Sequence, residues 1–457
     1  MPALDPGGPA LLLLAQAAEQ PDVNAGDTAF MIVAAALVLL MTPGLALFYG
    51  GMVRSKTVLN MMMMSFACLA VVPVLWTLYG YTMAFGPTMG NGLLGGFDFA
   101  GMRDTVGVVD DAGMPVLVFA SFQMMFAILT PALISGAIAD RAKFGGWVMF
   151  VVLWVSLVYF PVCHWVFSLD EGWIAARLGA FDFAGGTAVH INAGAAALAL
   201  TFVLGKRRGF PREAMKPHNL PLVLLGAGLL WFGWYGFNVG SQVAADGVAA
   251  TVLFNTTVAT GAAIVAWLGV EKLRDGHATT LGAASGAVAG LVAITPACNV
   301  VSPLGAIVVG LVAGGACAFA VSLKYRLGYD DSLDVVGIHL VGGIVGSLII
   351  GLLASAAVQG EGGVDGLFYG GGLEQLGIQT VAVLAVMAYS FVMSFVLGKL
   401  VDVTIGFRVS EEEELAGVDE TTHAESGYEI GGIRATGAFG ASPASARTPS
   451  AGQRADA

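Results

Sequence analysis

The chain has 457 residues, of which 57% are hydrophobic and only 11% are charged, and its mean hydropathy is +0.80. This composition excludes a soluble protein of this size, because too few polar side chains remain to cover its surface. The formal net charge is −12, but many of the acidic residues lie in loops and in the C-terminal tail, and no stretch is basic enough to bind nucleic acid. The sequence therefore predicts an all-α polytopic membrane protein.

Residues 1–25 form an N-terminal segment with two open interpretations. A short apolar run at residues 9–18 contains Ala15-Gln16-Ala17, which resembles a signal peptidase site. However, no Lys or Arg precedes the run, and Asp5 lies before it. A cleaved signal peptide and a retained segment remain equal alternatives.

Eleven apolar stretches follow within a transmembrane domain that we place at residues 26–404. A spanning helix needs roughly 20 apolar residues, and the eighth stretch is short and rich in glycine. The stretches lie near residues 28–50, 57–85, 115–138, 146–168, 182–205, 219–241, 247–270, 279–297, 301–323, 334–356 and 376–401.

The basic residues predict the orientation. They gather in the odd-numbered loops, such as Arg54 and Lys56 in the first and the cluster at residues 206–216 in the fifth. The even-numbered loops contain only Arg103 and Arg177. The positive-inside rule therefore places the odd loops and the C-terminus in the cytoplasm and the N-terminus outside, as eleven crossings of the cytoplasmic membrane require.

Two histidines, His190 and His339, lie inside apolar, glycine-rich segments that begin near Asp182 and Asp334. An ionisable side chain at membrane depth is costly and usually faces a cavity or a partner. Neutral imidazoles can hydrogen-bond to each other and line a narrow lumen. A structural core histidine is the alternative for each, and the two aspartates are then simply N-caps.

The similarity of these two segments predicts an internal duplication. Two five-helix halves, each with an odd number of crossings, must be inverted relative to each other, and a C-terminal helix brings the count to eleven. Many transporters use this architecture to place a site near the midplane of the membrane.

Aromatic side chains accompany the histidines. Phe122 and Phe126 are four residues apart and share a helix face. Trp165 ends the fourth segment, and Phe237 and Ser241 end the sixth, so the predicted topology brings these groups together at the external mouth. Aromatic faces and one hydroxyl suit a small cation. An aromatic belt at the membrane interface is the alternative.

The chain changes character after the last apolar stretch. Residues 405–430 are acidic and polar, which suits a surface or docking segment, whereas residues 431–457 are rich in Ala, Ser and Pro and are predicted to be disordered. The four cysteines stand singly, with no spacing typical of metal ligands. The sequence therefore predicts no metal and no cofactor.

Five stretches resemble signature motifs of the ammonium transporter family (Amt/MEP/Rh), and in particular its bacterial Amt branch. In chain order they are FQMMFAILTPALISGAIADR (122–141), PVCHW (161–165), FDFAGGTAVHINAG (181–194), WFGWYGFNVGS (231–241) and DDSLDVVGIHLVGG (330–343).

The resemblance assigns a role to each candidate residue on the outer side. It implies an ammonium-recruiting site formed by Phe122, Phe126, Trp165 and Ser241. Below this site it implies a gate in which Phe126 stacks on Phe237.

The resemblance also implies that His190 and His339 are the twin histidines of a pore and that Asp182 is an aspartate needed for transport. It implies eleven helices, a homotrimer with one pore in each subunit, and a PII-type signal protein that docks on residues 406–428 at the cytoplasmic face. The expected substrate is ammonium, with methylammonium as a further candidate.

A comparison of free energies indicates which species, ammonium or ammonia, crosses the membrane. Moving an ammonium-sized ion into a low-dielectric medium costs on the order of 20 kcal/mol in the idealised limit, whereas one cation–π contact returns about 2 kcal/mol. Deprotonation and passage of ammonia are therefore expected. An ammonium sensor is the main alternative. A hydrolase using Ser241, His190 and Asp182 is disfavoured because its nucleophile and base would lie at different depths, and a cation channel is disfavoured because no filter sequence is evident.

Overall fold

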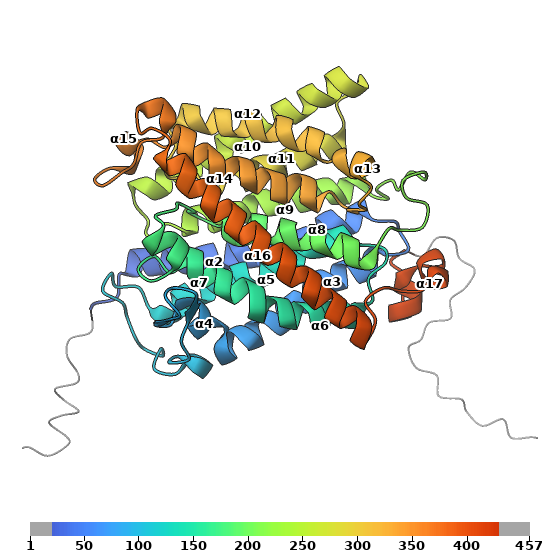
Figure 1. Ribbon diagram of the computed structural model, residues 1–457, viewed down its shortest axis with the longest axis horizontal. Helices are drawn as coiled ribbons and strands as arrows, with labels where there is room; N and C mark the ends of the chain where they lie inside the picture. The colour runs from blue at the N-terminus through green and yellow to red at the C-terminus, as the bar shows by residue number, and fades with distance from the viewer. Residues whose placement is uncertain (1–20, 429–457) are drawn as a thin grey trace, which may run out of the picture.

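The computed structural model describes residues 21–428, which fold mostly into helices that run along one bundle (Figure 1). The open question of a signal peptide at residues 1–20 and the predicted disorder of residues 431–457 fall outside this range. The α-helices are α2 (Ala25–Met52), α3 (Val58–Leu75), α4 (Tyr81–Phe85), α5 (Val116–Ser135), α6 (Phe144–Trp154), α7 (Phe160–Phe167), α8 (Asn192–Leu204), α9 (Leu220–Trp234), α10 (Gly247–Asp275), α11 (Thr280–Ile294), α12 (Pro303–Ala320), α13 (Leu323–Leu327), α14 (Val341–Leu353), α15 (Ala356–Gln359), α16 (Glu374–Thr404) and α17 (Glu411–Ala416).

In several places, helical elements that follow one another in the chain join end to end and form one longer span. Counting these joined helices and the single ones, ten spans within residues 21–428 are long and apolar enough to cross a membrane. This confirms an all-α polytopic membrane protein. The ten spans are Ala25–Met52, Val58–Phe85, Val116–Ile138, Phe144–Phe167, Gly186–Leu204, Leu220–Val239, Gly247–Asp275, Pro303–Leu327, Val336–Leu353 and Glu374–Thr404.

The predicted eighth span is α11, a helix of only 15 residues. Its glycines allow a close approach to α10, because a Cβ added at Gly290 would lie 2.6 Å from Ala263 Cβ and one at Gly286 would lie 2.9 Å from Trp267 Cβ. Close packing of small residues is how helices associate in a membrane. The structure thus has ten long spans and this shorter one, so the count of eleven spanning helices stays a prediction.

The loops alternate between the two ends of the bundle. At one end, Arg207 of the fifth loop bonds to Asp140 of the third loop and Asp330 of the ninth. At the other end, the backbone N–H of Phe183 in the fourth loop donates to Pro296 O in the eighth. This is the grouping of odd and even loops that the predicted topology requires. In Figure 1, α17 lies at the odd-loop end and α15 at the even-loop end.

Five spans contain a π-helical turn, which is rare and occurs frequently at functional sites. Two of these turns hold the histidines. The five turns are Trp76–Gly80, Val155–Tyr159, Gly186–Ile191, Tyr235–Val239 and Val336–Leu340. The only strands within residues 21–428 are β1 (Thr88–Met89) and β2 (Leu94–Gly95), which pair antiparallel in the second loop.

The described part of the tail folds back onto the odd-loop end. Helix α17 begins with a capping box in which Ser410 and Glu413 bond reciprocally. The Glu414 carboxylate accepts from Arg408 Nη2 at 2.9 Å and from the backbone N–H of Arg208 at 2.8 Å. Farther along, Asp419 accepts two backbone N–H groups at the start of α3. The tail is therefore bound to several loops of its own chain.

Candidate functional site

The two histidines meet inside the bundle. His190 Nδ1 and His339 Nδ1 lie 3.3 Å apart, so one ring donates a hydrogen bond to the other. The ring centroids are 5.3 Å apart and the planes differ by 22°. Both side chains are buried. The bond requires one Nδ1 to carry a proton and the other to be free of one, so the two imidazoles form a coupled pair.

Glycine allows the two histidine-bearing segments to touch. A Cβ added at Gly194 would lie 2.5 Å from Leu340 N, and one at Gly343 would lie 2.9 Å from Ile191 Cγ1. Any larger residue at these positions would push the segments apart and lengthen the contact between the imidazoles.

Asp182 holds the start of the first histidine segment. Its Oδ1 accepts the backbone N–H groups of Gly185 at 2.8 Å and Gly186 at 2.5 Å, and its Oδ2 accepts those of Thr187 at 2.7 Å and Ala188 at 3.1 Å. The Thr187 hydroxyl also donates to Oδ2. The carboxylate therefore satisfies the free donors of a helix that begins within the bundle.

The second histidine segment is held by Asp331, which the sequence analysis missed. Its carboxylate accepts the backbone N–H groups of Val335 and Val336 at 3.1 and 2.7 Å. The match of Asp182 with Asp334 is wrong, because the Asp334 side chain instead pairs with Lys324 Nζ at 2.6 Å. The sequence did contain a signal for the correct match, since Asp182 and Asp331 each lie eight residues before their histidine.

A line of aromatic rings leads to the histidines. Phe126 and Phe237 stack with centroids 4.1 Å apart and planes within 23°. Phe122 meets Phe126 edge-on at 4.9 Å, and the Phe237 centroid lies 6.0 Å from that of His190. All three phenylalanines are less than 2% exposed. The stacked pair therefore closes the path immediately beside the first histidine.

A cavity of about 520 Å³ lies at the even-loop end. Ser241, Asp182 and Phe167 line it together with the amide side chains Gln123 and Asn299. The Ser241 hydroxyl donates to Phe237 O at 2.8 Å. Because its proton is engaged, the oxygen of Ser241 is left to accept from a ligand.

Trp165 does not line this cavity, so its predicted place in one site with Ser241 is wrong. Its indole N–H donates to Leu93 O at 2.7 Å, and its ring packs on Tyr389 with centroids 4.7 Å apart. Phe167 lines the cavity instead and meets Phe126 edge-on at 6.2 Å. Two residues along a helix correspond to a rotation of about 200°, which places their side chains on nearly opposite faces. Helix α7 can therefore turn only one of these two aromatic side chains toward the site.

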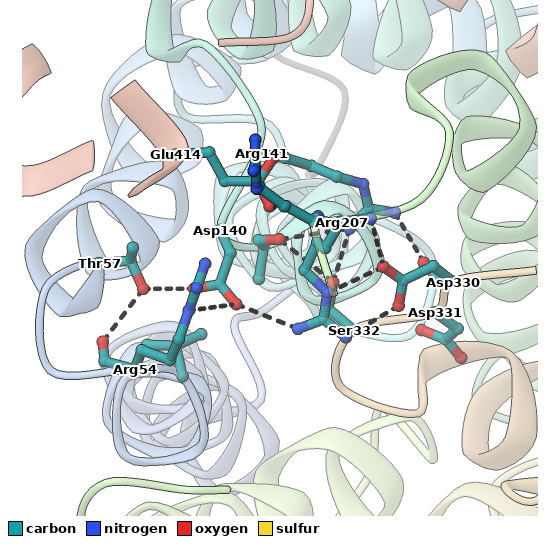
Figure 2. A network of polar contacts seen from close by, with 12 residues as sticks. Arg54, Thr57, Asp140, Arg141, Arg207, Asp330, Asp331, Ser332 and Glu414 are labelled. Atoms are coloured by element: carbon teal, nitrogen blue, oxygen red, sulfur yellow. Dashed lines mark hydrogen bonds and ion pairs between the residues drawn. The ribbon is translucent and has the colours of Figure 1, made fainter. Parts of the chain in front are cut away.

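A smaller cavity of about 150 Å³ lies at the odd-loop end, lined in part by Lys324, Asp334 and Arg207. Arg207 is central to a buried ion network there (Figure 2). Burial tends to raise the pKa of Asp330, but hydrogen bonds and charge from Arg207 lower it by more, so its pKa lies below the usual value. For Asp331 burial dominates and raises the pKa to about 6.

A membrane-spanning bundle that has a cavity at each end and, in its interior, a stacked aromatic pair beside two bonded imidazoles has the features of a membrane transport protein for a small polar species. Within residues 21–428, no group of three or more His, Cys, Asp or Glu side chains is placed to hold a metal ion.

Comparison with known proteins identifies the family. A model described as "Ammonium Transporter Family" matches residues 29–428. An ammonium transporter of Mycobacterium tuberculosis is 56% identical over 433 residues, covering 89% of this chain and 91% of that protein. One of Bacillus subtilis is 49% identical over 410 residues, covering 88% and 98%.

Solved structures agree with this result. Saccharomyces cerevisiae Mep2 superimposes with a TM-score of 0.77 at 34% identity, covering 85% of this chain and 91% of that one. A structure described as "Sensor Amt Protein" gives a TM-score of 0.80 at 28% identity, covering 87% and 98%. The chain belongs to the ammonium transporter family, and its function is ammonium transport across a membrane, not catalysis.

Proposed function

We propose that the protein captures ammonium in the cavity at the even-loop end, removes its proton near the gate of Phe126 and Phe237, and conducts ammonia past His190 and His339. The observation that carries this proposal is the contact between the imidazoles, 3.3 Å from Nδ1 to Nδ1, directly beyond the stacked pair.

The capture site combines aromatic faces with a hydroxyl that can only accept. Phe119 and Phe167 line it, Phe167 contacts Phe126 of the buried gate edge-on at 6.2 Å, and Ser241 Oγ offers lone pairs. Desolvated cation–π contacts supply about 2 kcal/mol each. Such a site selects a weakly hydrated cation and holds it loosely enough to release it.

The gate cannot pass the cation itself. The effective penalty for burying an ion in a protein remains several kcal/mol even after relaxation, and the two stacked rings offer no lone pair. Ammonia has no such penalty. Potassium has no proton to lose, so the same step also provides the selectivity.

The imidazole pair suits a neutral amine. Nδ1 of each ring is occupied by the other, and His190 Nε2 has no protein partner. This nitrogen can donate to the lone pair of ammonia or accept one of its N–H groups, depending on the tautomer. We propose that the released proton crosses separately along the two rings, which makes the transport electrogenic.

Reconstituted protein in liposomes tests this mechanism. We would record ammonium-dependent current and radiolabelled methylammonium uptake across pH for the wild type, His190→Ala and His339→Ala. His164→Gln is the matched control, because His164 is also buried but bonds to Ala84 O and Thr88 Oγ1, away from the path. We expect the two pore variants alone to lose the current or to conduct potassium. An unchanged ammonium current without potassium conduction in both variants would refute the role of the histidines.

We further propose a homotrimer in the cytoplasmic membrane, with the N-terminus outside and the C-terminus in the cytoplasm. The basic residues of the odd loops support this orientation. Because these loops and the tail meet at one end of the bundle, the capture cavity then opens to the outside. Labelling single cysteines in the second and fifth loops with an impermeant reagent on intact cells tests it. Reagent that reached the fifth loop but not the second would reverse the orientation.

The tail at residues 405–430 is proposed as a regulatory segment on which a PII-type signal protein docks. Its support is the set of contacts that Glu414 and Asp419 make with the loops. A chain ending before Ser410 should retain the pore but lose PII regulation. Undiminished PII binding and inhibition in that truncation would count against the proposal.

An ammonium sensor is the second candidate function, because a structure described as "Sensor Amt Protein" resembles this chain over 87% of its length. The two functions differ in one measurement. A transporter moves labelled substrate into liposomes, whereas a protein that only senses binds ammonium with no uptake.

A further inference from the structure

Gln123 is a buried amide side chain without a hydrogen-bonding partner. It is 8% exposed and lines the cavity at the even-loop end. Within residues 21–428 no group donates a hydrogen bond to its buried Oε1. A buried polar group without a partner costs about 1–3 kcal/mol, so a group in this state in a binding cavity points to a ligand.

The position of Gln123 on α5 fits a role in the site. It directly follows Phe122 and precedes Phe126 by three residues, so it lies in the helical turn that also carries the two phenylalanines beside the gate. The terminal amide torsion of glutamine is broad, and no hydrogen bond to Oε1 within residues 21–428 fixes it. The amide oxygen can therefore turn into the cavity when a donor arrives.

Asp182 cannot serve as the acceptor, although it is the only acidic residue in the cavity wall. Its two oxygens already receive four backbone N–H groups and the hydroxyl of Thr187. A carboxylate offers about four lone-pair sites, so none remains for a ligand. Asp182 contributes a negative charge at a distance but no hydrogen bond to a cation.

Asn299 repeats the pattern of Gln123 from a different element of the fold. It follows α11 in the eighth loop, lines the same cavity, and its Oδ1 has no donor. Ser241 contributes one further acceptor. The cavity thus contains several neutral acceptors, two of them buried amide oxygens without a donor within residues 21–428, and a carboxylate whose lone pairs are already engaged.

We propose that the carboxamides of Gln123 and Asn299, together with Ser241, are the N–H acceptors for ammonium in the capture cavity. This inference rests on the proposed function and adds residues that the sequence comparison did not suggest. Ammonium presents four N–H donors in a tetrahedron, and neutral oxygens accept them without the strong attraction of a free carboxylate. The site can therefore distinguish ammonium from methylammonium, in which a methyl group replaces one donor.

Uptake and current as functions of concentration test the proposal in liposomes. A hydrogen bond to a charged group is worth about 1.5–3 kcal/mol, so Gln123→Leu should raise the KM for ammonium roughly tenfold or more with little change in maximal rate. The KM for methylammonium should rise less, so the variant should prefer ammonium over methylammonium less strongly than the wild type does. Asn299→Leu should act in the same direction, and Gln123→Glu should lower the KM.

Gln359→Leu is the matched control, because Gln359 lies at the same end of the bundle but does not line this cavity, and both atoms of its amide are bonded to the backbone of Val364. Its KM should stay within twofold of the wild type. A purely structural role for Gln123 would change the amount of folded protein or the maximal rate without changing the ratio of the two KM values. If Gln123→Leu does not fold, Gln123→Glu and Asn299→Leu decide the question.

The failures of the two proposals are distinguishable. If the wild type transports ammonium and Gln123→Leu and Asn299→Leu both keep its KM within twofold, the acceptor assignment is overturned and the proposed function stands. If the wild type binds ammonium but moves none, the proposed function itself is refuted.

Discussion

Replacing Arg207 with methionine would remove the central cation from the buried network at the odd-loop end (Figure 2). The Arg207 side chain is 5% exposed, and it bonds to Asp330 through Nε at 2.9 Å and Nη2 at 2.8 Å. It also bonds to Asp140 through Nη1 at 3.0 Å. The third, fifth and ninth loops are thus joined by one side chain.

The expected loss depends on the partners that the two aspartates keep. Asp140 keeps Arg54 at 3.4 Å and the hydroxyl of Thr57. The fully buried Asp330 carboxylate keeps the backbone N–H of residue 207 at 2.7 Å and the nearby charge of Arg141, but no ion pair within residues 21–428. Removing one partner of a buried pair costs about 3–5 kcal/mol, because an uncompensated charge stays in the interior. We expect Arg207→Met to lose about that much free energy of unfolding.

The exposed pair of Arg208 with Glu411 provides the control. These side chains are 53% and 73% exposed, and such pairs contribute at most about 1 kcal/mol. Denaturant unfolding in detergent micelles, followed by tryptophan fluorescence, compares Arg207→Met with Arg208→Met. Equal losses in the two variants would refute the reasoning.

The dependence on pH gives an independent check. In the wild type the pKa of Asp330 is lowered, because the bonds and charge of Arg207 outweigh burial. Its contribution is therefore present at neutral pH and is lost as pH falls through the lowered pKa. Without the Arg207 side chain, only the charge of Arg141 and the backbone N–H of residue 207 oppose the effect of burial, so this pKa is higher in the variant, which therefore loses less stability than the wild type as pH falls. The difference between the two proteins should shrink from pH 7 toward about pH 4, and a constant difference would contradict this account.

Three further predictions follow from the site. Phe167→Ala should raise the KM for ammonium several-fold in liposome uptake, whereas Trp165→Phe should leave this KM unchanged. A larger rise in KM for Trp165→Phe than for Phe167→Ala would show that Trp165, not Phe167, belongs to the site. Asp331→Ala should cost about 1–2 kcal/mol in denaturant unfolding, as expected for a lost N-cap, and no change would show that water satisfies the freed N–H groups. Gly194→Leu should abolish ammonium current while the protein still reaches the membrane, because the new side chain would meet the backbone of Leu340, and a wild-type current would show that the segments can separate.

Much of the fold could be predicted because each membrane-spanning helix can be recognised from its own stretch of apolar sequence. Length and apolarity located the spans, and the basic residues grouped the loops correctly. The stacking of Phe126 on Phe237 and the meeting of the two histidines follow the family motifs, and the structure brings each of these pairs together.

The errors arose where the direction of a side chain mattered more than its position in the sequence. Trp165 and Phe167 lie on one short helix, and a π-helical turn at Val155–Tyr159 precedes it and shifts its register. Hydropathy carries no information about that rotation. Asp334 was matched by its nearness to an apolar run, although the free N–H groups lie within reach of Asp331.

The π-helical turns at Gly186–Ile191 and Val336–Leu340 give the chain an unusual sensitivity to length. A π-helical turn holds an extra residue relative to an α-helical one, and each residue rotates a helix by about 100°. Deleting one residue from either turn would restore ordinary helical bonding, yet it would swing the imidazole away from its partner. We therefore expect insertions and deletions to be far more harmful between Asp182 and His190, or between Asp331 and His339, than most substitutions there. The interval of eight residues is as much a part of the site as the residues at its ends.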